Sequence, residues 1–157
     1  MKAPFVVCCD SREQTPPPFP EGVTLERWTL ETGDYTTPML QPIAVIERKS
    51  VSDFASSITR DRERFDDEIR RMLAYRWRAI VVEGDLSEVY RSSAAHPHSI
   101  LGSIASFFAR ADCPCLFAVN AHGAGRLISG ILRRWEERVA AETEAAGLAP
   151  TFAARST

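Results

Sequence analysis

The sequence predicts an α/β protein in which helices flank a mixed β-sheet. Strand-like apolar segments dominate the first fifty residues, and helical periodicity alternates with short apolar runs after Ser50. This alternation implies a partly parallel sheet with helices on both faces. A chain of 157 residues suits one domain with a full core, which we expect over residues 1–147, with a disordered tail over 148–157.

The first part of the chain predicts strands joined by turns. Residues 5–9 form a compact apolar strand that ends at Asp10, and residues 23–30 alternate with a period of two. Three consecutive prolines between them exclude a helix or a central strand there. Tyr35 begins another extended segment, and an apolar strand follows over 43–49. We expect these strands to form an antiparallel meander.

The second part predicts helices that alternate with strands. Ser50 or Ser52 can cap a short helix that places Phe54, Ala55 and Ile58 on one side. The other expected elements are a helix over 61–75, a strand over 79–82, a helix over 99–110, a strand over 115–119, and a final helix that starts near His122 and passes Trp135.

The composition is that of an ordinary soluble globular protein, with 45% hydrophobic and 25% charged residues. No apolar segment approaches the length of a membrane span, and residues 1–4 lack a secretory pattern. We therefore expect a cytoplasmic protein without a membrane partner.

The four cysteines favour buried free thiols. They lie inside apolar runs, at Cys8, Cys9, Cys113 and Cys115. A zinc site made from all four is the less favoured alternative, because adjacent cysteines on a strand point to opposite faces and do not readily share one tetrahedron.

The strand over 43–49 ends in Glu47, Arg48 and Lys49, a charged tripeptide that suggests a hard-metal site. Glu47 and Lys49 share one face of a strand, and Arg48 points to the other. Asp34 on one side and Asp53 on the other can approach Glu47, and such carboxylates repel one another unless a divalent cation lies among them. A neighbouring ammonium can orient water or stabilise charge on a phosphate. The alternative is a solvated strand end.

The same residues resemble a nuclease signature. Gly33-Asp34, then Glu47-Arg48-Lys49, then Asp53 resemble the GD-Xn-ERK-XXX-D pattern of the XPF-type structure-specific endonucleases, a branch of the PD-(D/E)xK nucleases. Three further segments fit in order and extend the match over most of residues 5–135: the strand to Asp10 followed by Ser11-Arg12-Glu13, the arginine-rich stretch 60–68, and the apolar strand ending at Glu83.

The resemblance implies a restriction-endonuclease-like fold and a Mg²⁺- or Mn²⁺-dependent DNA endonuclease. Asp34, Glu47 and Lys49 would be catalytic. Asp34 and Glu47 would hold the cation with Asp53 and Asp10 nearby, and Lys49 would position or deprotonate the attacking water. Asp53 is otherwise a partner for a helix dipole, and Asp10 is otherwise a turn residue.

Overall charge does not favour tight DNA binding, because 19 basic residues face 21 acidic ones and the net charge is -2. Arginines nevertheless cluster after residue 60, and Arg62, Arg64 and Arg48 are candidate DNA contacts. A solvated helix face explains Arg62 and Arg64 equally well, and an ion pair is the alternative for Arg48. A loop ion pair is nearly as good an interpretation of Arg12 and Glu13 as a role in the site.

The three histidines, His96, His98 and His122, lie outside the signature. The Pro97 between the first two is typical of turn and capping chemistry before a helix, so we place none of the three in the site.

The resemblance also implies partners. Branched, flapped or forked DNA would be the substrate, in repair or recombination, and a bacterial protein would be nucleoid-associated. Nothing in the sequence resembles the helicase or the tandem helix-hairpin-helix module of family members, so an additional DNA-binding or helicase partner is expected. We also expect a homodimer, because apolar residues of the last two helices exceed what one small sheet requires: Ile100, Ile104, Phe107, Phe108, Leu127, Ile131 and Trp135.

Two other functions remain open at this point. One is a non-catalytic DNA-binding or scaffold subunit of a nuclease complex. The other is a resolvase or exonuclease of the same fold.

Overall fold

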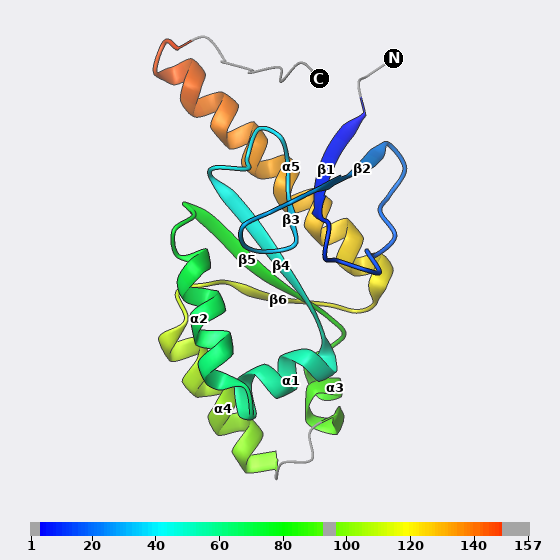
Figure 1. Ribbon diagram of the computed structural model, residues 1–157, viewed down its shortest axis with the longest axis vertical. Coiled ribbons are helices and arrows are strands. Elements are labelled where there is room, and N and C mark those ends of the chain that lie inside the picture. The colour runs from blue at the N-terminus through cyan, green and yellow to red at the C-terminus, as the bar shows by residue number, and fades with distance from the viewer. Residues whose placement is uncertain (1–3, 93–96, 149–157) are drawn as a thin grey trace.

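The computed structural model describes residues 4–92 and 97–148, which form one six-stranded sheet and five helices (Figure 1). The strands are β1 (Phe5–Asp10), β2 (Val23–Trp28), β3 (Tyr35–Thr36), β4 (Ala44–Ser50), β5 (Trp77–Glu83) and β6 (Cys115–Ala118). The helices are α1 (Val51–Thr59), α2 (Arg62–Met72), α3 (Leu86–Ser92), α4 (Pro97–Arg110) and α5 (Ala121–Ala145). His96 and residues 149–157 of the expected tail lie outside the described residues.

The sheet is mixed, as the sequence predicts, and its strand order is β2-β1-β3-β4-β5-β6. The expected antiparallel meander is wrong for the first pair, because β1 and β2 are parallel, with Phe5 opposite Val23 and Asp10 opposite Trp28. The proline-containing segment 11–22 is long enough to carry the chain back to the starting end of β1, whereas a tight turn would have given an antiparallel hairpin. β3 then pairs antiparallel with both β1 and β4.

The second half of the sheet is parallel, because helices connect β4 to β5 and β5 to β6. Glu47 lies opposite Ile80, and Ser50 lies opposite Glu83. The carboxyl ends of β4 and β5 therefore meet at one edge of the sheet. The last residues of β4 lie at this edge, beside the start of α1.

Two apolar clusters fill the two faces of the sheet. On one face, Val7, Ile46 and Val81 pack against Ile128 and Leu132 of α5. Figure 1 shows α5 crossing this face, with its C-terminal end projecting past the strands.

The other face carries α1, α2 and α4. Val45 and Ile80 of the sheet pack there with Phe54, Phe65 and Phe107 of these three helices. The aromatic rings contribute edge-on and stacked contacts, including a stacked pair between Phe65 and Phe107 at 5.2 Å. This packing fixes α1 and α2 against the end of β4.

Ser50, one of the two caps that the sequence offers, starts α1. The Ser50 hydroxyl accepts a hydrogen bond of 3.1 Å from the backbone amide of Asp53, which satisfies one free donor of the first turn. Phe54, Ala55 and Ile58 are buried on the inner side. The short helix α3 is the one described helix that the sequence did not predict.

The described cysteines are free, as expected. Cys8, Cys9 and Cys113 are buried and Cys115 is partly exposed. Burial raises the pKa of Cys113 to about 11, so this thiol stays protonated near neutral pH. Within residues 4–92 and 97–148, no helix is long and apolar enough to cross a membrane.

Candidate active site

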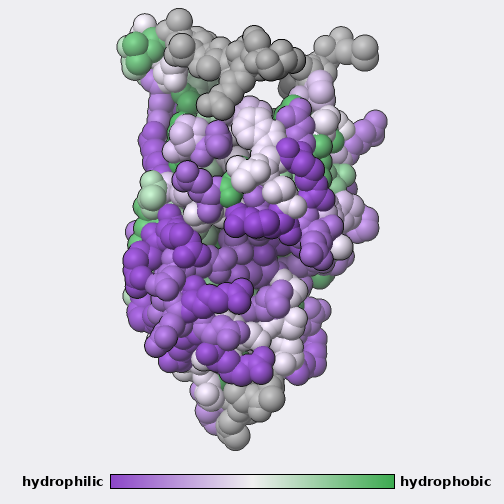
Figure 2. Space-filling model, in the orientation of Figure 1, coloured by the Kyte–Doolittle hydropathy of each residue, from purple (hydrophilic) through white to green (hydrophobic). Residues whose placement is uncertain are grey.

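A polar cleft of about 610 Å³ opens where β4 ends against α1 and α2. Hydrophilic residues dominate the middle of the molecule and the surface over α1 and α2 (Figure 2). Eight carboxylates and five basic side chains line the cleft, so without a bound cation it is net negative. These residues are Asp10, Glu13, Glu31, Asp34, Glu47, Asp53, Asp61 and Glu68, with Arg12, Arg48, Lys49, Arg64 and Arg71.

Asp34 is placed by the tight turn at Gly33. Gly33 has a φ of 75°, and a Cβ there would lie 2.1 Å from Cγ2 of Val45, so both conformation and space require glycine. The turn lets the Asp34 amide donate to the Ile46 carbonyl at 2.9 Å. The Asp34 carboxylate accepts from the Arg48 amide at 2.8 Å. The side chain is thereby held against the end of β4.

Glu47 is buried beside Asp34, with 8% of its surface exposed. Burial raises the pKa of Asp34 to about 6, against a hydrogen bond from the Arg48 amide that lowers it. Burial and the nearby Asp34 charge raise the pKa of Glu47 well above its ordinary value. The two carboxyl groups therefore do not readily both ionise in the absence of a cation.

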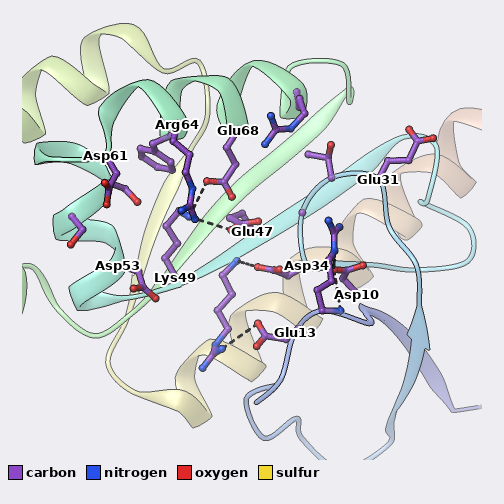
Figure 3. Close-up of a pocket in the computed structure, with 18 residues that line it drawn as sticks. Asp10, Glu13, Glu31, Asp34, Glu47, Lys49, Asp53, Asp61, Arg64 and Glu68 are labelled. Atoms are coloured by element: carbon purple, nitrogen blue, oxygen red, sulfur yellow. Dashed lines mark hydrogen bonds and ion pairs between the residues drawn. The ribbon is translucent and has the colours of Figure 1, made fainter.

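Lys49 lies between two glutamates (Figure 3). Its Nζ is 3.3 Å from Glu47 Oε1 and 3.0 Å from Glu68 Oε2. The ammonium also lies 5.0 Å from the centroid of the Phe65 ring. Burial lowers the pKa of Lys49, but the two carboxylates outweigh it, and the pKa lies above the ordinary value. Lys49 is therefore an ammonium at neutral pH and not a free amine.

Arg48 points to the opposite face of β4, as the alternation along the strand predicts. It forms ion pairs with Glu83 at the end of β5 and with Glu13 at 3.3 Å. Only 15% of its side chain is exposed. Its guanidinium therefore ties β4 to β5 and to the loop after β1. Glu13, in that loop, is one of the two carboxylates that pair with Arg48.

Asp10 and Asp53 line the cleft but do not gather around Glu47. Asp10 is buried, and its carboxylate accepts from Arg12 at 2.6 Å and from the Leu30 amide at 3.0 Å. Burial raises the pKa of Asp10, but these hydrogen bonds outweigh it and hold the pKa below its ordinary range. Asp53 is exposed in the first turn of α1, on the helix side of the cleft (Figure 3).

The structure does not bring the four expected carboxylates together around one point. In the part of the chain that it describes, no three His, Cys, Asp or Glu side chains form a group that could hold a metal ion. Asp34 and Glu47 are the two whose pKa values respond to each other. Asp10 is already engaged by Arg12.

The two candidate arginines of α2 differ. Arg64 lines the cleft, and within the described residues it forms no ion pair. Arg62 instead donates to the Ile58 carbonyl at 3.0 Å and to the Ser103 hydroxyl at 3.1 Å, which ties α2 to α1 and α4. Arg62 does not line the cleft.

Glu68 and Arg71 are cleft residues that the sequence did not single out. Glu68 lies one helical turn after Arg64 on α2 and reaches Lys49. Burial raises the pKa of Glu68, but its hydrogen bonds with Glu47 and Lys49 and the charges of Lys49 and of Arg71, three residues further on, outweigh burial and lower this pKa. The helical spacing of Arg64, Glu68 and Arg71 is a signal that would have placed all three on one face.

Comparison with known proteins identifies the kind of domain to which this site belongs. The model of the ERCC4 domain family matches residues 9–131. No curated protein matches the chain.

Two solved structures share the fold. XPF from Aeropyrum pernix superimposes with a TM-score of 0.68 at 25% sequence identity, over 88% of this chain and 69% of that one. The same protein in complex with DNA gives a TM-score of 0.68 at 24% identity, over 85% of this chain and 66% of that one. The chain thus spans about two thirds of each relative's length.

Proposed function

The chain belongs to the ERCC4 domain family, and from that premise and its cleft we propose that it is a divalent-metal-dependent endonuclease that cuts branched, flapped or forked DNA. We further propose that residues 1–147 act as a single nuclease domain.

One observation carries the proposal: a buried carboxyl, Glu47, and a partly buried one, Asp34, lie next to a fixed ammonium. Asp34 and Glu47 have raised pKa values because they share a buried corner, and Lys49 lies 3.3 Å from Glu47. Strongly perturbed acids gathered in a cleft are typical of a catalytic site. Glu68 gives Lys49 a second carboxylate partner, which keeps the ammonium in place.

The donor set fits a hard divalent cation. Carboxylate oxygens are the ligands that Mg²⁺ and Mn²⁺ prefer, and Asp34 and Glu47 would hold the ion. The raised pKa values support this assignment, because a cation offsets the burial that favours the protonated carboxyls and, at Glu47, the nearby charge of Asp34. Asp10 and Asp53 would contribute from further out. When bound, a divalent cation polarises a phosphoryl oxygen and lowers the pKa of a bound water.

The side chains of the cleft would position the phosphate and the water. Lys49 stays protonated, so it would donate hydrogen bonds to the attacking water or to a phosphate oxygen and would not remove a proton. Of the two roles that the sequence allows for Lys49, we therefore propose that it positions the water and does not deprotonate it. Arg64 and Arg71 at the α2 side of the cleft would contact neighbouring phosphates.

DNA is the proposed substrate, and a relative of the same fold is known in complex with DNA. The excess of carboxylates in the cleft implies weak binding without a cation. An additional DNA-binding or helicase partner would supply the remaining affinity. We also propose that the protein acts in the cytoplasm, at the nucleoid in a bacterium.

We propose that the active form is a homodimer. Not all of the apolar residues expected to be in excess are free for it, because Ile100 and Phe107 are buried in the core. Helix α5 nevertheless carries an open, largely apolar groove of about 400 Å³. Its lining residues are Arg126, Leu127, Gly130, Ile131, Arg134 and Trp135.

A panel of labelled flap, fork, four-way and linear DNAs tests the proposed activity. Each substrate is incubated with Mg²⁺, Mn²⁺ or chelator. Metal-dependent cleavage of flaps and forks near the junction is expected. Cleavage of four-way DNA alone would indicate a resolvase, shortening from an end would indicate an exonuclease, and binding without cleavage would indicate a non-catalytic subunit.

A further inference from the structure

A second hollow of about 320 Å³ adjoins the catalytic cleft. Glu31 and Thr32, in the segment between β2 and β3, line both. Thr32 is two residues from Asp34, so about 7 Å at most separates their Cα atoms. A ligand held at Asp34 can therefore extend into this pocket. The pocket residues are Thr29, Leu30, Glu31, Thr32, Thr36, Gln41, Pro42, Val45 and Tyr75.

The chemistry of the pocket is the opposite of that of the cleft. Glu31 is its one charged lining residue, and no basic side chain lines it, so it offers a phosphate no positive charge. Its walls include Pro42, Val45 and the ring of Tyr75. A partly apolar pocket without basic side chains suits a planar heterocycle.

Several polar groups of the pocket remain available to a ligand. Thr36 is already engaged, because its hydroxyl donates to the Ala44 carbonyl at 2.7 Å. Within the described residues, the side chains of Thr29, Thr32 and Gln41 make no hydrogen bond. Hydroxyl and amide groups supply both donors and acceptors, which is what the edge of a nucleobase requires.

We propose that this pocket holds the base of a nucleotide whose phosphate lies in the catalytic cleft, with the base stacked on Tyr75. The proposal rests on the proposed nuclease function. A nucleotide has a charged phosphate and a neutral, planar base, and the cleft and the pocket match these two parts in order. Tyr75 follows α2 and packs in part against the core, which holds its ring in place.

The pocket gives the enzyme a way to select a junction. A base in continuous duplex must leave the stack before it can enter a protein pocket, whereas a base at a fork is already unpaired. Stacking on an aromatic ring tolerates every base, so the selection would be for structure and not for sequence. Tyr75 is therefore assigned as a specificity residue.

The test removes the base and the ring separately and together. Forked DNAs that carry a single abasic residue at successive positions across the junction are bound in Ca²⁺, and fluorescence anisotropy gives the affinity. For the parent protein, one or two adjacent abasic positions should weaken binding by roughly 5- to 100-fold, the worth of one stacked base. Tyr75→Leu should weaken binding to intact fork by a similar factor.

The losses of affinity caused by the abasic residue and by Tyr75→Leu should not be additive. For Tyr75→Leu, an abasic residue at the sensitive position should lower the affinity hardly any further, because the ring on which the base stacks is already absent. Tyr75→Phe keeps the ring and should behave like the parent protein, which separates stacking from any loss of fold. Tyr90→Leu on α3, another partly exposed tyrosine, is the matched control and should leave the abasic effect intact.

The outcomes separate this inference from the proposed function. Additive effects at every position, or no sensitive position at all, would overturn the base pocket even if the protein cuts forks. Non-additivity at one position in a protein that cuts no DNA would support the pocket and contradict the nuclease proposal.

Discussion

The carboxylate of Asp34 accepts a 2.8 Å hydrogen bond from the backbone amide of Arg48. Arg48 stands between Glu47 and Lys49, so the bond places Asp34 beside both catalytic candidates. The donor is main chain, so this placement depends on the strand and not on the arginine side chain. The Gly33 turn and the end of β4 together form the frame of the site.

The stability of the protein should report the charge on Asp34. Burial raises its pKa from 3.8 to about 6. A carboxyl whose pKa rises on folding contributes stability below its unfolded pKa, and this contribution is lost as the pH rises through its folded pKa. In chelator, the melting temperature of Asp34→Asn should therefore rise relative to that of the parent protein between about pH 4 and pH 7.

Divalent metal extends this comparison. Mg²⁺ at neutral pH should raise the melting temperature of the parent protein and leave that of Asp34→Asn almost unchanged. Thermal unfolding followed by circular dichroism measures both effects. Parallel pH curves for the two proteins would show that Asp34 does not carry the assigned pKa.

Lys49→Gln should both slow cleavage and change its pH dependence. Loss of a positioned charge donor should lower the plateau rate by about 100- to 1000-fold. Because the ammonium lowers the pKa of Asp34 and of Glu47, its removal should also shift the acidic limb of the rate profile to higher pH.

Arg64→Gln is the control for the Lys49 variant, because it removes a positive charge of the cleft that is not among the main causes of the pKa shifts of Asp34 and Glu47. It should leave the acidic limb in place. If Lys49→Gln changed neither the acidic limb of the rate profile nor the plateau rate, Lys49 would have no part in the reaction.

The arginines of α2 should separate into a DNA contact and a structural residue. Arg64→Ala should weaken binding to all forks alike and reduce the salt slope by about one, as loss of a phosphate contact does. Arg62→Ala should lower the melting temperature, because Arg62 bonds to Ile58 and Ser103, and should leave the salt slope unchanged. Anisotropy in Ca²⁺ at several salt concentrations measures the salt slope, and thermal unfolding measures the melting temperature. A reduced slope for Arg62→Ala and a lowered melting temperature for Arg64→Ala would contradict the two assignments.

The proposed dimer can be tested without damage to the core. Gly130 lies in the α5 groove, and a Cβ at this position meets no other atom within 4 Å. Gly130→Glu should favour the helix and place a charge in the groove, so it should convert a dimer to a monomer. Gly102→Glu on α4, equally open, is the matched control and should remain dimeric. Light scattering that shows a monomeric parent protein at micromolar concentration would contradict the dimer.

Local rules predicted much of the fold. A serine cap of α1 at Ser50 or Ser52 and the opposite orientations of Glu47 and Arg48 follow from chain geometry over a few residues, and the structure has the cap at Ser50 and these orientations. The α/β architecture also follows, because helical and strand periodicities alternate after Ser50. The placement of Asp34 next to Glu47 does not follow from local rules, since thirteen positions separate them in the sequence. The sequence predicts it from the cation that clustered carboxylates require and from the nuclease resemblance.

The features that the sequence did not predict depend on contacts between segments that lie far apart in the chain. The parallel pairing of β1 and β2 depends on the path of segment 11–22, which turn propensities do not specify. Glu68 reaches Lys49 only because α2 packs across the end of β4. The different positions of the Arg62 and Arg64 side chains depend on the position of α4, since Arg62 donates a hydrogen bond to Ser103 of that helix.

The central claim is that Asp34 and Glu47 hold the cation that permits cleavage. Single-turnover cleavage of a labelled fork in Mg²⁺ tests it, with Asp34→Asn, Glu47→Gln and the exposed control Glu63→Gln on α2. The two amides keep shape but lose the charge that binds a hard cation, so each should cut at least about 100-fold more slowly while remaining folded. The control should cut like the parent protein. Cleavage at the parental rate by either Asp34→Asn or Glu47→Gln would contradict the account, and loss of folding in both would assign the pair to the structure instead.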